Sequence, residues 1–242
     1  MTALYDDPDF FAQYQAMPRS QAGLSAAGEW PTFERLLPDL AGKRVLDLGC
    51  GYGWQCRYVA DHGAAAVLGV DASEKMLAVA REKNAAPAIT YQQATIQAFS
   101  APAGSFDLVL SSLALHYLED FGAVVAHVHQ WLAPGGVFLF TVEHPVFTAE
   151  GSQDWLYDKN GEPWKWPVDH YFDEGKREAH FLDRTVTKYH HTLTTFVDTL
   201  LTHGFSLQRL VEPQPAPALR DRPDMQSSLR MPMMLIIKAQ RQ

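Results

Sequence analysis

Short apolar runs alternate with amphipathic helical segments from Arg44 onward, and this alternation restricts the fold more than any other feature of the chain. Seven runs are predicted to be strands, namely residues 44–49, 66–71, 88–93, 106–112, 137–144, 206–212 and 233–240. Strands that are separated by helices form a parallel sheet with helices on both faces. The sequence therefore predicts an α/β fold that binds its ligand at the carboxyl ends of the strands.

Capping residues support the helices between these strands. Ser73 precedes an amphipathic segment at residues 74–84 and suits an N-cap, where its hydroxyl would accept a backbone hydrogen bond. Gly63 follows the segment at residues 54–62, and glycine readily adopts the left-handed conformation that ends a helix. Local residue choice and apolar periodicity thus agree on the same elements.

Composition excludes several classes of protein. The chain has 242 residues, of which 47% are hydrophobic and 20% charged, as in a soluble globular protein. Its longest apolar runs are too short to span a bilayer, and its acidic start differs from a secretory signal, so we expect a cytoplasmic protein without membrane contact. The net charge of -8 opposes binding to nucleic acid. Cys50 and Cys56 fit neither a disulfide framework nor a metal site.

Residues 45–53 form the most informative motif, in which an apolar strand runs into a glycine-rich turn before a helix. Glycine lets a ligand approach the backbone closely, and free amides at the start of a helix donate hydrogen bonds. The motif departs from the dinucleotide-binding fingerprint, because Trp54 stands where the third glycine belongs. Asp47 would oppose a phosphate, but it could position the turn or receive an ammonium group. The motif therefore favours a positively charged ligand.

Asp71 ends the second predicted strand, twenty residues after Gly51, where a carboxylate can accept both hydroxyls of a ribose. The segments DLGCGYG and GVDASEKML together resemble the class I S-adenosylmethionine-dependent methyltransferases, in particular the branch that includes ubiquinone-biosynthesis C-methyltransferases. The resemblance covers roughly residues 44–142. It implies a Rossmann-like, mostly parallel sheet of seven strands in which the last strand, residues 233–240, is antiparallel.

The resemblance implies S-adenosylmethionine as the cofactor. The glycine turn would line its methionine part, Asp71 would hold the ribose, and Ala72 and Met76 would pack on the adenine. The usual aspartate before Ala94 is replaced by Gln93, so the adenine amino group would need another acceptor, such as the Gln93 amide oxygen or a backbone carbonyl. The expected cofactor-binding residues are Arg19, Asp47, Gly49, Cys50, Gly51, Asp71, Ala72, Met76, Ala94, Thr95, Ser111 and Leu113.

Two segments fall outside this core. Prolines divide the first forty or so residues into short helices, and about forty-five residues rich in aromatic side chains follow His144. A structureless loop of that length is uncommon inside a compact domain, so an inserted cap is expected after the fifth strand. We predict a single domain, residues 1–242, with an N-terminal helical cap at 1–42, a cofactor-binding core at 43–144, an inserted substrate cap at 145–188 and the C-terminal part of the sheet at 189–242.

Methyl transfer is an in-line displacement, so the enzyme mainly holds a nucleophile near the methyl group in a dry pocket. If the acceptor must lose a proton, His116 and His144 are the candidate catalytic residues, since each follows a strand. The alternative, which we favour, is that either histidine is a packed or solvent-facing residue without a catalytic role. Several aromatic residues of the insertion could form a wall for an aromatic or hydrophobic acceptor, or simply its own core: Trp155, Trp164, Trp166 and Phe172.

Transfer of a methyl group to a small molecule is the leading hypothesis. A nicotinamide-dependent oxidoreductase on the same fold is the alternative that Trp54 and Asp47 disfavour. A non-catalytic protein that keeps the cofactor site is a further alternative. No basic strip points to protein or nucleic-acid methylation, no metal is expected, and the chain could be a monomer or a homodimer.

Overall fold

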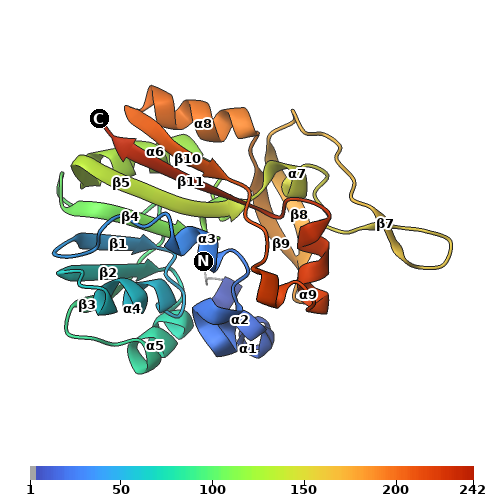
Figure 1. Ribbon diagram of the computed structural model, residues 1–242, viewed down its shortest axis with the longest axis horizontal. Coiled ribbons are helices and arrows are strands. Elements are labelled where there is room, and N and C mark those ends of the chain that lie inside the picture. The colour runs from blue at the N-terminus through green and yellow to red at the C-terminus, as the bar shows by residue number, and fades with distance from the viewer. Residues whose placement is uncertain (1–3) are drawn as a thin grey trace.

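The computed structural model describes residues 4–242, except for the side chains of residues 223, 224 and 227. A seven-stranded sheet in the order β10-β11-β5-β4-β1-β2-β3 forms its centre (Figure 1). The strands are β1 (Arg44–Leu48), β2 (Ala66–Asp71), β3 (Ile89–Gln93), β4 (Phe106–Ser112), β5 (Leu132–Glu143), β10 (Phe205–Val211) and β11 (Met234–Arg241). Only β11 runs antiparallel to its neighbours, β5 and β10. The predicted Rossmann-like fold with an antiparallel last strand is confirmed.

Helices cover both faces of this sheet because successive strand residues point to opposite sides. Leu108 and Leu110 of β4 pack with α3 (Trp30–Glu34) and α4 (Trp54–Asp61). Val109, between them, packs on the other face, against the helices α6 (Phe121–Trp131) and α8 (Leu193–Thr202). The helix α5 (Glu74–Lys83) lies beside β2 and β3.

The helix caps expected from the sequence are present. Ser73 is the N-cap of α5, and its hydroxyl accepts a hydrogen bond of 3.1 Å from the Met76 backbone amide. Gly63, just after α4, has a φ of 94°. Local sequence thus fixes where these two helices begin and end.

The N-terminal residues form short helical pieces, as predicted. They comprise η1 (Leu4–Asp6), α1 (Pro8–Ala16), α2 (Pro18–Ala22), η2 (Gly23–Ala26) and α3. Pro18 and Pro31 lie in the first turns of α2 and α3, where a missing amide costs no hydrogen bond. Figure 1 shows α1 and α2 beside the end of the sheet toward which the parallel strands point. This placement puts them next to the expected ligand site.

The segment between β5 and α8 contains a short helix and two hairpins. They are α7 (Pro145–Thr148), β6 (Leu156–Tyr157) with β7 (Pro163–Lys165), and β8 (Gly175–Phe181) with β9 (Arg184–His190). The first hairpin projects from the body as an arm, whereas the second lies close to the sheet (Figure 1). The cap expected after the fifth strand therefore has strands of its own.

Four short helical turns complete the fold: η3 (Leu115–Tyr117), η4 (Pro217–Leu219), α9 (Pro223–Gln226) and η5 (Ser227–Leu229). Within residues 4–242, no helix has both the length and the apolar character that a bilayer span requires.

Candidate active site

The glycine turn between β1 and α4 has a backbone that only glycine adopts readily. Gly49, Gly51 and Gly53 have φ values of 75°, 54° and 74°, all in the left-handed region. The amides of Gly49 and Cys50 donate hydrogen bonds of 2.8 and 3.0 Å to the Val70 carbonyl oxygen near the end of β2. The turn is therefore anchored to the neighbouring strand.

The turn also packs closely against its surroundings. A Cβ atom at Gly49 would lie 2.4 Å from the Cβ of Ala114, which is closer than real Cβ contacts allow. At Gly51 the nearest atom would be the Cε of Met76, at 3.2 Å. The structure thus places Met76, an expected adenine contact, directly beside the turn.

Asp71 lies at the end of β2 and contacts the turn. Its Oδ2 accepts a hydrogen bond of 2.8 Å from the Gly51 amide, and its Oδ1 accepts one of 2.9 Å from the Ser73 amide. Burial raises the pKa of Asp71, although these two backbone bonds act in the opposite direction. The structure brings Asp71, Gly51 and Met76 together, as the ribose and adenine hypothesis requires.

Asp47 is almost fully buried, with 2% of its surface exposed. Burial raises its pKa to about 7, although the Cys56 thiol donates a hydrogen bond of 3.3 Å to its Oδ2. Because this folded-state pKa lies above the ordinary value, Asp47 stabilises the fold at low pH and loses that contribution as pH rises through about 7. A cationic group bound nearby would favour the ionised form.

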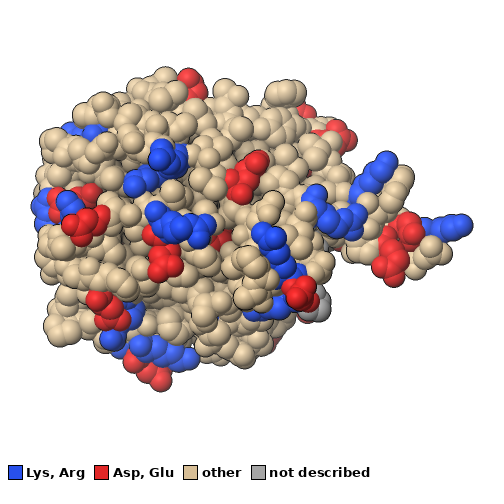
Figure 2. All heavy atoms as spheres, viewed as in Figure 1, with Lys and Arg blue, Asp and Glu red and all other residues tan. Residues whose placement is uncertain are grey.

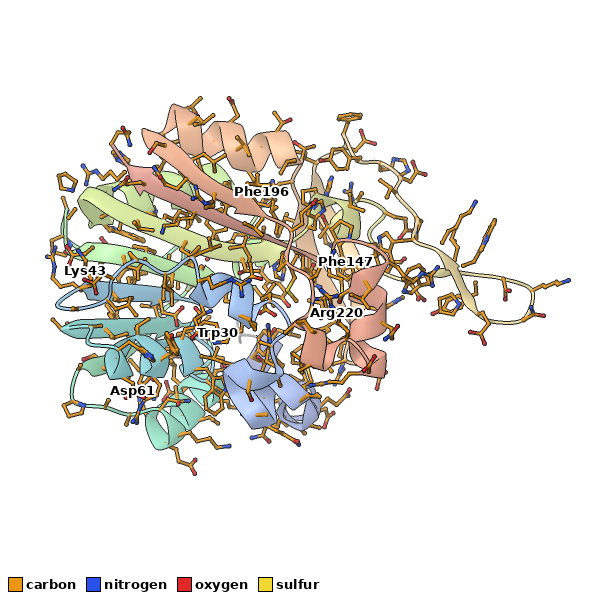
Figure 3. All side chains as sticks on the ribbon, in the orientation of Figure 1. Trp30, Lys43, Asp61, Phe147, Phe196 and Arg220 are labelled. Carbon is orange, nitrogen blue, oxygen red and sulfur yellow. The ribbon has the colours of Figure 1, made fainter. Side chains whose placement is uncertain are left out.

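A cavity of about 90 Å³ lies between the glycine turn and the N-terminal helices. Its lining includes Asp47, Gly49, Cys50 and Gly51 from the turn segment, and Arg19 from α2. Trp30 of α3, another lining residue, lies at the end of the sheet that faces α1 and α2 (Figure 3). The cavity therefore joins the predicted turn residues to Arg19, which lies far from them in the sequence.

Several buried polar atoms of this cavity have no hydrogen-bond partner within the described chain. They are Glu29 Oε2, Tyr52 Oη, Trp54 Nε1 and Gln55 Oε1. The other Glu29 oxygen forms an ion pair with Arg19. Buried polar groups normally have partners, so a ligand with both donors and acceptors fits here. The amino-acid end of S-adenosylmethionine has this character, because its ammonium donates and its carboxylate accepts.

The residues expected at the adenine lie around Asp71. The Ala94 amide donates to the Asp71 carbonyl oxygen at 3.0 Å, and the Gln93 side-chain amide donates to the Ala72 carbonyl oxygen at 3.2 Å. Thr95 is exposed, and its hydroxyl accepts a bond from the Ala98 amide. This bond uses the Gln93 side-chain nitrogen and does not involve its amide oxygen.

The segment after β4 carries backbone strain. Leu113 has a φ of 54°, which is uncommon for a residue with a branched side chain, and its amide donates to the Thr141 carbonyl oxygen at 2.8 Å. Ser111 is fully buried and donates to the Leu48 carbonyl oxygen, whereas Ser112 lines the cavity. Strain of this kind often accompanies functional sites. The strained residue, Leu113, lies just before η3, which contains His116.

His116 belongs to a buried polar cluster at the ends of β4 and β5, with Glu143, Gln153 and Lys188. Lys188 Nζ donates to Glu143 Oε1 at 2.5 Å and to Gln153 Oε1 at 2.7 Å, and Gln153 Nε2 donates to Glu143 Oε2 at 2.6 Å. His116 Nε2 lies 3.9 Å from Glu143 Oε1. Burial lowers the pKa of His116 to about 4, so the ring is neutral at pH 7.

His144 lies apart from this cluster. His144 is the N-cap of α7, and its Nδ1 accepts a hydrogen bond of 3.0 Å from the Val146 amide. Its Nε2 lies 2.9 Å from a carboxylate oxygen of Glu212, which follows β10. Burial lowers its pKa as well. The two histidines expected near the acceptor therefore face different partners, and His144 Nδ1 is occupied by the Val146 amide.

The aromatic residues of the insertion divide into two groups. Trp166 stacks on Phe147 at 4.8 Å and makes an edge contact with Trp155, close to where the arm leaves the body (Figure 3). Trp164 and Phe172 are exposed, by 56% and 88% of their surface. The first group forms a small core, which is one of the two alternatives that the sequence left open.

Sequence reasoning missed Glu143, Gln153 and Lys188. Glu143 could have been found, because it ends an apolar strand as Asp71 does. Gln153 and Lys188 lie in the insertion, where no local pattern indicates that their side chains turn inward. Among residues 4–242, no group of three or more His, Cys, Asp or Glu side chains is placed to hold a metal ion.

Comparison with known proteins decides the family. A family profile described as "Methyltransferase domain" matches residues 46–140. A crystal structure of an S-adenosylmethionine-dependent methyltransferase from Mesorhizobium loti is 43% identical, covers 90% of this chain and 100% of its own, and superposes with a TM-score of 0.83. The chain belongs to the S-adenosylmethionine-dependent methyltransferases. A Listeria monocytogenes protein provisionally given the same description is 50% identical, with coverage of 91% and 99% and a TM-score of 0.87.

The methyltransferase also resembles curated enzymes over part of their length. A ubiquinone biosynthesis O-methyltransferase from Aromatoleum aromaticum is 40% identical over 113 residues, which are 46% of this chain and 48% of that protein. The chain thus matches only about half the length of this relative. The expected family and cofactor are confirmed, whereas the acceptor has to be argued from the site.

Proposed function

We propose that this methyltransferase acts on a small-molecule acceptor that binds between the cofactor cavity and the polar cluster around His116. A continuous set of tyrosines joins the two regions and supports this proposal. Tyr14 lines the cavity, and its ring centre lies 5.1 Å from that of Tyr5. The Tyr5 hydroxyl oxygen is 3.3 Å from the Tyr117 hydroxyl oxygen. The Tyr117 ring lies 4.5 Å from the ring of His116. An acceptor in this region would face the cofactor on one side and the cluster on the other.

The cofactor, when bound, supplies a methyl group on a positively charged sulfur. We propose that Asp71 holds its ribose, that Ala72, Met76, Ala94 and Thr95 surround its adenine, and that its amino-acid end meets Arg19, Glu29, Trp54 and Gln55. Asp47 would stabilise the ammonium group, directly or through water. The unpartnered atoms of Glu29, Trp54 and Gln55 support this arrangement, because they offer both acceptors and a donor.

The N-terminal segment would exclude water from this site. Asp6 Oδ1 accepts hydrogen bonds from the Ser73 hydroxyl at 2.5 Å and the Lys75 amide at 3.2 Å, which holds η1 beside Asp71 at the start of α5. Water exclusion strengthens the electrostatic interactions of a reacting pair and keeps the nucleophile close to the methyl carbon.

We propose that His116, rather than His144, contacts the acceptor. The Glu143 amide donates a long hydrogen bond of 3.5 Å to His116 Nδ1, and this contact favours the tautomer with its proton on Nε2. His116 in this state is a neutral hydrogen-bond donor, and it would need the other tautomer to remove a proton through Nε2. His144 Nδ1 is occupied by the Val146 amide and its Nε2 lies beside the Glu212 carboxylate, away from the cluster, so we propose that His144 supports the wall formed by α7.

Surface charge supports a small acceptor over a macromolecule. The net charge is -8, and basic and acidic side chains are interspersed on the face shown in Figure 2. The aromatic side chains beside His116 suit an aromatic or hydrophobic acceptor. The free cysteines Cys50 and Cys56 support a reducing compartment, and we propose that the enzyme acts in the cytoplasm.

The test is transfer of a labelled methyl group from S-adenosylmethionine to fractions of a cell extract. We expect label in the small-molecule fraction and about a tenfold slower transfer by His116→Gln, because a hydrogen bond to the acceptor is lost. His127→Gln on the exposed side of α6 is the control and should transfer at the normal rate. Label confined to protein or nucleic acid would refute the proposal.

A further inference from the structure

A buried cluster of four polar side chains joins the insertion to the end of the sheet: His116, Glu143, Gln153 and Lys188. Its members come from η3, the end of β5, the segment after α7 and β9, and all four side chains converge at one end of the sheet. The Lys188 side chain is only 4% exposed and that of Glu143 15%. Burying two charges carries a large desolvation cost, and apolar side chains of similar size often stabilise such a position equally well. This cost favours a functional role.

Backbone strain at Gln153 supports the same conclusion. Its φ is 59°, in the left-handed region, and its side chain closes the ring of hydrogen bonds with Glu143 and Lys188. A non-glycine residue in this region is strained. The fold thus tolerates backbone strain at two places, at Leu113 just before η3 and at Gln153 within the cluster.

The cluster has N–H donors that are not used in the hydrogen bonds among Glu143, Gln153 and Lys188. Lys188 has three N–H groups, of which one goes to Glu143 and one to Gln153. The His116 Nε2–H group lies 3.9 Å from Glu143 Oε1, beyond the range of a hydrogen bond. Two N–H groups, one from a cation and one from a neutral ring, therefore remain for a ligand.

Aromatic rings surround these donors. The Phe181 ring centre lies 5.4 Å from Lys188 Nζ, and Phe181 also contacts Phe10 of α1 at 5.9 Å. On the other side, the Tyr117 ring packs on His116 and leads toward the cofactor cavity. An apolar surrounding strengthens the attraction between Lys188 and an anion, because water screens it less.

Charge balance indicates which acceptor fits. Burial opposes ionisation of Glu143, yet Lys188, the hydrogen bonds to its carboxylate and His116 when protonated hold its pKa below the ordinary value. The ionised Glu143 and Lys188 cancel each other. The bound cofactor would add a positively charged sulfur, which an anionic acceptor would help to neutralise and a neutral acceptor would not.

We infer that Lys188 and His116 together bind an anionic oxygen of the acceptor, so that the substrate is a small acid with a carboxylate or an ionised acidic hydroxyl group. This inference rests on the proposed function. Glu143 and Gln153 are positioning residues that aim the Lys188 ammonium group at the acceptor. The recognised feature is the anionic oxygen, whichever atom receives the methyl group.

Binding of small probes tests the inference without requiring the natural acceptor. Benzoate, cinnamate and 4-nitrophenol are titrated into the enzyme saturated with S-adenosylhomocysteine, together with the neutral counterparts benzamide, cinnamamide and 4-nitroanisole. We expect at least one acid to bind at least tenfold more tightly than its counterpart. Bound 4-nitrophenol should show the absorption of the phenolate at a pH where the free compound is mostly protonated.

Two variants and a matched control separate recognition from folding. Lys188→Met should abolish the preference for acids, while Lys176→Met removes a solvent-exposed ion pair from the same hairpin and should keep it. Glu143→Gln should increase the preference, because it removes a competing negative charge while its amide oxygen still accepts one of the two hydrogen bonds that the carboxylate accepts. A purely structural cluster would not produce that gain, so Glu143→Gln remains decisive if Lys188→Met unfolds.

The outcomes are distinguishable. If no acid binds better than its neutral counterpart, or if the preference survives Lys188→Met in a protein that still binds S-adenosylhomocysteine, the inference is wrong. If S-adenosylhomocysteine itself fails to bind the wild type, the assignment of the cofactor cavity fails first.

Discussion

Gly49→Ala is expected to lower the free energy of unfolding by about 3 kcal/mol and to abolish measurable binding of S-adenosylhomocysteine. The substitution places a side chain where φ is 75°, and the new Cβ would lie 2.4 Å from the Cβ of Ala114. The left-handed conformation costs about 1 kcal/mol and the overlap another 1–3 kcal/mol. Denaturant unfolding and calorimetric titration measure the two effects.

Gly42→Ala is the matched control for this prediction. Gly42 has a similar φ, 72°, but a Cβ there would meet no atom within 4 Å. This variant should lose only about 1 kcal/mol from the conformational cost and should bind the ligand normally. Equal loss of stability in both variants would show that the close packing of the turn against Ala114 contributes nothing.

Asp71→Ala should weaken binding of S-adenosylhomocysteine about 100-fold or more, which corresponds to about 3 kcal/mol. The variant loses the proposed acceptor of both ribose hydroxyls, and each charge-assisted hydrogen bond contributes about 1.5–3 kcal/mol. It also releases the amides of Gly51 and Ser73 from the carboxylate, which loosens the turn. Calorimetric titration measures the change.

Asp61→Ala provides the comparison, since Asp61 pairs with Arg57 on the solvent-exposed side of α4. An exposed ion pair contributes little, so this variant should bind the ligand as tightly as the wild type. If Asp71→Ala also keeps its affinity within about threefold, or about 0.7 kcal/mol, the ribose does not depend on this carboxylate.

The parts of the fold that depend on local sequence could be predicted. Ser73 caps α5 and Gly63 follows α4 as expected, because caps act over only a few residues. Asp71 and the glycine turn were found for the same reason, since each lies at the end of an apolar strand. Their proximity follows from the parallel pairing of β1 with β2.

Contacts between distant segments could not be predicted in the same way. The sequence places His116 and His144 after neighbouring strands, but it does not indicate that His144 turns toward Glu212 while His116 turns toward Glu143. The difference depends on β11 and β10 lying on the far side of β5. Lys188 reaches the site because its hairpin packs beside η3 and α7 at the end of the sheet, and no short-range pattern encodes that path.

The ion pair between Arg19 and Glu29 illustrates the same limit within the N-terminal cap. Arg19 was expected to meet the carboxylate of the cofactor, and it does line the cavity. Its own partner, Glu29, is buried and keeps one oxygen without a hydrogen bond. Two short helices must pack together before this pair can form, so residue spacing alone does not reveal it.

A crystal structure with bound S-adenosylhomocysteine measures the central claim most directly, through the distances from the Asp71 carboxylate to the two ribose hydroxyl oxygens. Both should be about 2.5–2.8 Å, as for hydroxyl groups that donate to a carboxylate. A nucleoside whose ribose lies more than about 4 Å from Asp71, beyond any direct hydrogen bond, would contradict the account.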